Sequence, residues 1–274
     1  RASLVYRHVT DLTIPQSLMS DELREGFSSN AHVDGRVHGQ TGKASLEISV
    51  PEGMSVTLGG RTMGDSSVRK IGGNVLALRC PIEAIEGVKG DVGLLYASAK
   101  RVRNCGGDLV SFYHDRWDGG RWLDGKRLRT EPSPMSIKNV IGHIELDVGN
   151  VDVELREPSG SVAVKNRTGK TELTGRRLPG DKQCRIENRA GDIVLKVSEE
   201  VLRERHIAAS ALSGEMDYRI LSELLDSVRT ANNPQMMLIS NQPVRDSRDP
   251  DINDLEADIF AVAEYGDIRF ELLK

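Results

Sequence analysis

The sequence predicts an all-β fold, a single right-handed β-solenoid (β-helix) with an N-terminal arm and two insertions. Three observations support this prediction. A unit of Gly, then often Asp or Asn, then alternating apolar residues recurs along the chain. Its clearest copies follow one another at a step of 17 residues, and the chain has 27 Gly but only 4 Phe and 2 Trp. With so few aromatic residues, the hydrophobic core has to be built from Val, Leu and Ile packed between many tight corners.

The repeating unit is most regular in the first half of the chain. Its corners begin at Gly73, Gly90 and Gly107, and Asn or Asp follows each of them. Glycine supplies the positive φ that a corner needs, and the Asx side chain can hydrogen-bond to the turning backbone. Further copies open at Gly142, Gly149, Gly160, Gly169, Gly191, Gly214 and Gly266. We therefore expect a corner and a new strand at each of these glycines.

Period-two alternation follows the corners, as in strands with one buried face. After Gly149, for example, the apolar residues are Val151, Val153 and Leu155. Two topologies suit such strands: an antiparallel β-sandwich, or a solenoid that stacks one coil on the next. Hairpin proteins place a turn about every 8 to 12 residues. The strongest copies here recur at 17 to 23 residues, which makes the solenoid the prediction and the sandwich the alternative.

The repeat is interrupted in three places, and these define the predicted domain organisation. Residues 1–34 lack the unit and form an N-terminal arm or cap, which covers an open end of the solenoid domain at 35–274. Insertions are predicted at 112–136, an aromatic and basic loop, and at 219–258, a helical excursion. In the second insertion one helical face is shared by Ile220, Leu221, Leu224, Leu225 and Val228.

Composition excludes some classes of site and favours no class of partner. A net charge of −4 with 28% charged residues is ordinary for a folded protein. Cys80, Cys105 and Cys184 have no Cys-x-x-Cys spacing and no neighbouring His, so no metal site is predicted, although one disulfide stays open. No stretch approaches the roughly 20 apolar residues of a membrane span. The start at Arg1 rather than Met is typical of a processed chain.

Several strand motifs resemble those of a known family. They are the Asn-Arg-x-Gly copies at 166–169 and 188–191, the strand at 191–197 that leads to a second unit at Ser213 and Gly214, the closing strand at 264–270, and the opening Leu46, Ile48, Val50, Pro51, Glu52, Gly53. In these the chain resembles the adhesin family of right-handed β-solenoids. That family is related to the bacterial head GIN adhesin domain and includes eukaryotic proteins with predicted mitochondrial targeting. The resemblance runs from about Gly42 to the C-terminus and implies a fold and a non-catalytic role.

Motifs that could carry chemistry have structural interpretations here. Gly169, Lys170 and Thr171 end like a phosphate-binding loop, but that loop needs a glycine where Val164 stands. The triplet at 166–168 matches the N-glycosylation pattern, yet it coincides with a repeat corner.

Parallel β-helices include carbohydrate-cleaving enzymes that use clustered acids, so Asp91, Asp108 and Asp192 are a conceivable catalytic ladder. Each follows a corner glycine, however, where Asp normally binds the backbone. We therefore predict no catalytic residues.

The insertion at 112–136 is the most distinctive segment, because it gathers scarce aromatic residues among basic ones. Its candidate partner-binding residues are Tyr113, Trp117, Arg121 and Trp122, since Trp, Tyr and Arg are favoured interface anchors. The alternative is that these side chains fold the loop back on the solenoid. Interleaved Asp115, Asp118 and Asp124 argue against nucleic acid.

We therefore expect a non-catalytic structural or interaction protein, an accessory or scaffold subunit of a larger assembly whose partners are other protein subunits. No cofactor, small-molecule substrate or nucleic-acid partner is expected. A mitochondrial location after transit-peptide removal is favoured over a bacterial cell envelope. The alternatives are a cell-envelope adhesin and, after it, a solenoid enzyme that acts on polysaccharide.

Overall fold

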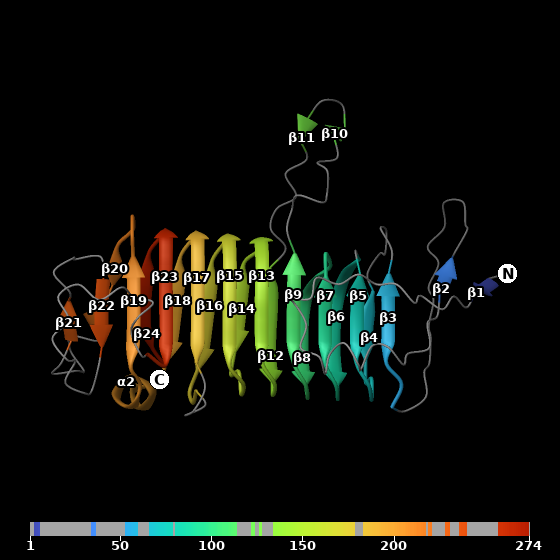
Figure 1. The fold of residues 1–274 in the computed structure, drawn as a ribbon, viewed down its shortest axis with the longest axis horizontal. Coiled ribbons are helices and arrows are strands. Elements are labelled where there is room, and N and C mark those ends of the chain that lie inside the picture. The colour runs from blue at the N-terminus through green and yellow to red at the C-terminus, as the bar shows by residue number, and fades with distance from the viewer. Residues whose placement is uncertain are drawn as a thin grey trace.

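The computed structural model describes residues 53–59, 66–78, 80–113, 134–178, 183–217, 219–220 and 257–273. For Tyr113 and for the short strands at 3–5, 34–36, 122–123, 126–127, 228–230 and 236–239 it describes the backbone alone. The fold is all-β, as predicted, and most of its strands lie in two large sheets along one elongated body (Figure 1).

Sheet I has eleven strands and sheet II has nine. Sheet I contains β3 (Val56–Gly59), β5 (Val75–Leu78), β7 (Val92–Leu95), β9 (Leu109–Tyr113), β13 (Ile144–Asn150), β15 (Val162–Thr168), β17 (Cys184–Ala190), β19 (Ile207–Ala211), β21 (Val228–Thr230), β22 (Met236–Ile239) and β23 (Ile259–Tyr265). Sheet II contains β4 (Ser67–Arg69), β6 (Pro81–Val88), β8 (Ser98–Cys105), β12 (Met135–Val140), β14 (Val153–Arg156), β16 (Thr171–Gly175), β18 (Ile193–Val197), β20 (Met216–Asp217) and β24 (Ile268–Leu272).

Apart from the short strands β10, β11, β21 and β22, the chain passes alternately between the two sheets. We call each strand of sheet I, together with the strand of sheet II that follows it, a rung. In chain order, rungs 1 to 9 are β3–β4, β5–β6, β7–β8, β9–β12, β13–β14, β15–β16, β17–β18, β19–β20 and β23–β24. Strands of neighbouring rungs pair in parallel, and within the large sheets only β22 pairs antiparallel, with β19 on one side and β21 on the other. These pairings contradict the alternative of an antiparallel β-sandwich.

The core fills the space between the two sheets. One cluster of buried apolar side chains reaches from Val68 to Phe270, and Val, Leu, Ile and Ala make up most of it. In β14, for example, Val153 and Leu155 point inward while Glu154 and Arg156 face out. The period-two pattern of the sequence therefore gives each rung one buried face, and stacking the rungs makes that face continuous.

The rungs do not stack strictly in chain order. In both sheets rung 9 lies between rungs 7 and 8, so that β23 pairs with β17 and β19, and β24 pairs with β18 and β20. Figure 1 shows this as a reversal of colour, because red β23 stands between β17 and orange β19. A stack of successive coils was expected, and this part of the expectation is wrong.

Corner glycines are required mainly by close approach and not by a positive φ. Only Gly169 and Gly191 among the predicted corners have φ in that region, at 129° and 134°. At Gly107 an added Cβ would lie 2.1 Å from Asp91 Oδ1 and 2.8 Å from the Gly90 carbonyl carbon. Most of the predicted corners are confirmed, but Gly149 lies within strand β13 and opens no new strand. The reason for most of the corner glycines is that a neighbouring rung occupies the space of a side chain.

A second column of corner residues does take positive φ, and the sequence did not reveal it. Lys70, Gly87, Asn104, Asn139 and Glu157 have φ of 55°, 70°, 55°, 56° and 49°. Strand registers place them next to one another in rungs 1 to 5. Only one of the five is glycine, since Asn and a few other residues tolerate this conformation.

The interruptions of the repeat are described in part. β1 (Ser3–Val5) pairs antiparallel with β2 (Asp34–Arg36), and β10 (Trp122–Leu123) with β11 (Lys126–Arg127), away from the two sheets in Figure 1. Within the predicted helical excursion, Arg219 and Ile220 are helical, but Val228 begins strand β21; residues 221–227 lie outside the described part. The domain boundaries stay predictions.

One short helix, α2 (Glu199–Glu204), was not predicted. Ser198 caps it by accepting a hydrogen bond from the Val201 amide at 3.3 Å, and two acidic residues occupy its first turn. The helix buries Val201 and Leu202 against the core. It replaces a corner between rungs 7 and 8, and with six residues it is too short to show helical periodicity in the sequence.

Candidate interaction surface

The four predicted partner-binding residues cannot be brought together from the described part of the chain. Tyr113 is the last residue of β9 and Trp122 the first of β10, both with backbone alone. Trp117 and Arg121 lie outside the described residues. Whether these four residues form one contact surface therefore stays a prediction.

The corner carboxylates form two separate ladders. Asn74 Oδ1 accepts the Asp91 amide at 2.9 Å, Asp91 Oδ1 accepts the Asp108 amide at 2.8 Å, and Asp108 Oδ1 accepts the His143 amide at 2.7 Å. All of these residues precede strands of sheet I. Asp192 precedes β18 in sheet II and accepts the Asp267 amide at 3.1 Å. Asp91, Asp108 and Asp192 therefore do not form one cluster, and each carboxylate is bound to the backbone of the next rung in space.

A third ladder lies inside the core. Asn166 and Asn188 are 2% and 3% exposed, and Asn188 Nδ2 donates to the carbonyl oxygens of Gly169 and Asp192 at 3.1 and 3.0 Å. Thr171 donates to Asn188 Oδ1 at 2.8 Å. The asparagine of the N-glycosylation pattern is thus enclosed in the core, and the threonine of the phosphate-loop mimic begins a strand.

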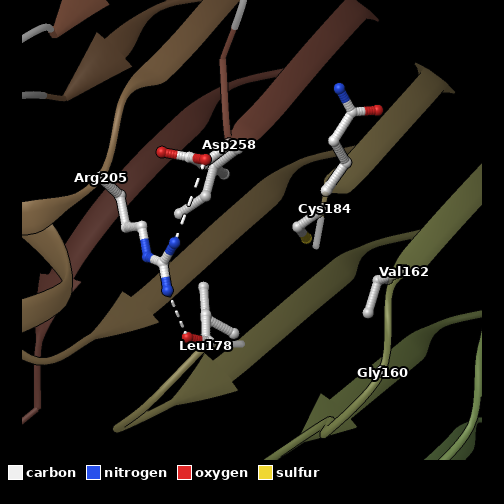
Figure 2. Close-up of a pocket in the computed structure, with 8 residues that line it drawn as sticks. Gly160, Val162, Leu178, Cys184, Arg205 and Asp258 are labelled. Carbon is white, nitrogen blue, oxygen red and sulfur yellow. Dashed lines mark hydrogen bonds and ion pairs between the residues drawn. The ribbon is translucent and has the colours of Figure 1, made fainter. Parts of the chain in front are cut away.

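A small cavity of about 10 Å³ lies beside Cys184 (Figure 2). That volume holds at most about one water molecule. Arg205 borders it, donates to the Leu178 carbonyl oxygen at 2.7 Å and lies 4.0 Å from the Asp258 carboxylate. Arg205 thereby links a segment just after rung 6 to the residue that opens rung 9. The cavity has no room for an organic ligand.

The three cysteines are buried in the described part of the chain, and their state bears on a disulfide, a reactive thiol and a metal site. Cys80, Cys105 and Cys184 are buried free thiols, which answers the open question of a disulfide. Burial raises the pKa of Cys105 and of Cys184 to about 12, and it also raises that of Cys80. No group of three or more His, Cys, Asp or Glu with metal-binding geometry occurs among the described residues.

The outer face of sheet II carries an unusual column of cations. Arg103, Lys138 and Arg156 occupy matching positions on β8, β12 and β14, and all three are exposed. We call these three residues the cationic column. Neighbouring strands lie about 4.8 Å apart. Two unit charges at about 5 Å repel one another by roughly 0.8 kcal/mol even in water.

Within the column, only Arg156 is neutralised. It binds Glu154, which stands two residues earlier on the same strand. Neither Arg103 nor Lys138 has a carboxylate within ion-pair distance in the described part of the protein. Beside them, Asn139 Nδ2 donates to Asn104 Oδ1 at 2.9 Å, so a short amide ladder continues the polar surface.

Elsewhere on sheet II, charges of opposite sign adjoin. Arg69 lies 3.7 Å from Glu86, and Lys196 lies between Glu172 at 2.8 Å and Glu271 at 3.4 Å. Burial acts to raise the pKa of Glu172, but hydrogen bonds from Lys170 and Lys196 outweigh it and lower the pKa. The Glu172 hydrogen bond raises the pKa of Lys196. Sheet II can thus pair its charges. The cationic column departs from that arrangement between Arg103 and Lys138, although Glu86 on β6 is the strand neighbour of Arg103 on its other side.

Sequence reasoning missed the column although a signal was present. Each of its residues stands four positions before a corner glycine, at Gly107, Gly142 and Gly160. Aligning the copies by their glycines would have placed the three cations together. The insertion after β9 hid this alignment, because it separates Arg103 from Lys138 by 35 residues.

No helix in the described part of the chain is long and apolar enough to cross a membrane. Comparisons with protein-family models, with curated proteins and with solved structures each found no match.

Proposed function

We propose that this protein is a non-catalytic scaffold, a right-handed β-solenoid of the adhesin type that serves as an accessory subunit of a larger assembly. Nine parallel rungs with one continuous core support a solenoid. The corner acids and core amides are committed to backbone and side-chain hydrogen bonds between rungs. The cavity beside Cys184 takes no more than about one water molecule. These observations favour a surface role.

The cationic column carries the proposal that the surface binds an acidic segment of a partner protein. Stacked cations raise the energy of the free protein, and an acidic partner relieves that repulsion on binding. Arg adds a planar guanidinium that suits carboxylates. An extended acidic peptide fits best, because the column is a line along the rungs and the surface around it is a flat sheet.

The decisive experiment neutralises the cationic column and measures whether the partner protein is still recovered. Arg103→Gln with Lys138→Gln should abolish recovery of the native complex after crosslinking in cells. The matched control is Lys165→Gln with Arg167→Gln, two exposed cations on β15 of sheet I with the same total change in charge. The control should retain the complex.

The stability of the same double variant shows whether the cationic column binds a partner or supports the fold. Because the neutral column removes repulsion, the denaturation midpoint of Arg103→Gln with Lys138→Gln should equal or exceed that of the parent. Loss of the complex together with a lower midpoint would contradict the proposal. So would a parent protein that stays monomeric after crosslinking.

A mitochondrial location completes the proposal and rests on the family resemblance alone. Protease protection of the full-length precursor product in isolated mitochondria tests it. Recovery at a cell surface instead would favour the adhesin alternative.

A further inference from the structure

The position of rung 9 suggests a second kind of interaction, one that goes beyond the cationic column and does not depend on it. Rung 9 follows rung 8 in chain order, yet it fills a slot between rungs 7 and 8. Residues 218–256 connect rung 8 to rung 9, and β21 and β22 of this connection cover the outer edge of β19. The rung that comes last in chain order is therefore internal to the stack.

Rungs 8 and 9 follow the same sequence pattern. In order along each rung come an inward Ile, two inward Ala, a corner Gly, an acidic residue and an inward Met or Ile. The matching pairs are Ile207 and Ile259, Ala209 and Ala261, Ala211 and Ala263, Gly214 and Gly266, Glu215 and Asp267, and Met216 and Ile268. The two rungs therefore present closely similar interior side chains in sheet I, while in sheet II rung 9 has the longer strand and adds buried Phe270.

The hydrogen bonds around the slot are equally repetitive. The Cys184 amide donates to the Asp258 carbonyl oxygen at 2.8 Å, and the Ile259 amide, at the matching position of rung 9, donates to the His206 carbonyl oxygen at 3.1 Å. At the opposite corner Asp192 accepts the Asp267 amide at 3.1 Å, and Asp267 accepts the Glu215 amide at 3.0 Å. The hydrogen bonds between rungs 7 and 9 are thus of the same kinds as those between rungs 9 and 8.

The slot nevertheless selects its occupant. An added Cβ at Gly266 would lie 2.3 Å from the Gly191 carbonyl oxygen, and one at Gly214 would lie 2.0 Å from that of Gly266. A rung that enters must therefore carry glycine at this corner. The chain's own residues 257–273 meet this requirement.

We propose that the slot between rungs 7 and 8 is a binding site for a rung, and that a second copy of this chain can supply it by exchange of residues 257–273. An exchanged rung makes every contact that it makes within one chain, so exchange costs little apart from association. Rung 8 can stack directly on rung 7 while the slot is empty. That closure keeps the core of the acceptor covered until a donor rung enters.

The test uses two variants, Lys196→Cys and Glu271→Cys, each of which adds one cysteine to the three buried native thiols. Lys196 and Glu271 are neighbours on β18 and β24, Glu271 is exposed and Lys196 partly exposed, and their charged atoms lie 3.4 Å apart. The two variants are unfolded together, refolded and oxidised. A disulfide between different chains requires that β24 of one copy lies beside β18 of the other, and its yield should rise with protein concentration.

Two controls make the result decisive. One chain with both substitutions should form the disulfide internally, which shows that the geometry permits it. A mixture of Glu83→Cys and Lys100→Cys, an ion pair at 2.7 Å between rungs 2 and 3, should give no disulfide between chains. The proposal is overturned if the Lys196 and Glu271 mixture gives none either, or if both mixtures give equal amounts.

Discussion

The close approach of neighbouring rungs decides which residues the corners can hold. At Gly107 the space for a Cβ belongs to Asp91 and to the backbone of Gly90. At Gly87 that space is open, with the Lys70 backbone nitrogen 3.7 Å away. Two glycines twenty residues apart thus have opposite tolerance for substitution.

We expect Gly107→Ala to destabilise the protein by at least about 1–3 kcal/mol, because the added methyl group overpacks a rigid corner. Gly87→Asn should stay within roughly 1 kcal/mol of the parent, since Asn104 and Asn139 adopt the same conformation in the same column. Urea denaturation midpoints measure both effects. Equal losses in the two variants would show that close approach does not determine the corners.

The buried thiols make stability depend on pH at the alkaline end. The pKa of Cys184 is raised from 9.0 to about 12 by burial, so the fold favours the protonated thiol. This contribution is present below pH 9 and is lost as the pH rises toward 12. The unfolding free energy of Cys184→Ala should therefore fall less steeply over this window than that of the parent. Identical slopes in the two titrations would refute the assignment.

At the scale of elements, Arg205 fastens α2 and rung 8 to their neighbours. Its side chain is 13% exposed, and its bond to Leu178 and its ion pair with Asp258 join segments distant in the chain. Arg203, on the same helix, has a 54% exposed side chain and pairs with Glu199 one turn away.

We expect Arg205→Ala to cost about 1–3 kcal/mol, because the Leu178 carbonyl loses its charged donor in a partly buried place. Arg203→Ala should cost at most about 0.5 kcal/mol, as exposed pairs on a helix usually do. Thermal denaturation of the two variants tests the difference. A cost for Arg203→Ala as large as that for Arg205→Ala would mean that the helix, and not the link between rungs, carries the effect.

Much of each element could be predicted from the sequence, and its limits have physical causes. Gly90, Asp91 and Gly107, Asp108 marked real corners because the same backbone path repeats there with one spacing. Rung 9 could not be placed, because Ile259 and Ile207 begin equivalent patterns and either could stack on Cys184. The cationic column was missed because register, and not sequence distance, brings Arg103 beside Lys138.

On the scale of the whole molecule, position in the stack should outweigh position in the chain. Terminal segments usually exchange their amide hydrogens quickly, because they fray. Strand β23 is enclosed by β17 and β19, so its amides lie within the sheet.

We therefore expect peptides from residues 259–272 to be protected from hydrogen–deuterium exchange at least as strongly as those from 207–217, which lie nearer the end of the stack. Mass spectrometry after native-state exchange compares them within one sample. Faster exchange of 259–272 would show that rung 9 occupies its slot only part of the time.

The enclosed C-terminal rung also limits how translation can be coupled to folding. Domains generally begin to fold from the N-terminus while the ribosome is still at work. Rungs 1 to 7 can form in that order, but residues 257–273 emerge after rung 8 and must enter between two rungs that were synthesised before them. The stack can therefore close only after residue 273 has left the ribosome, and a nascent chain that stops before residue 257 lacks an internal layer of the stack.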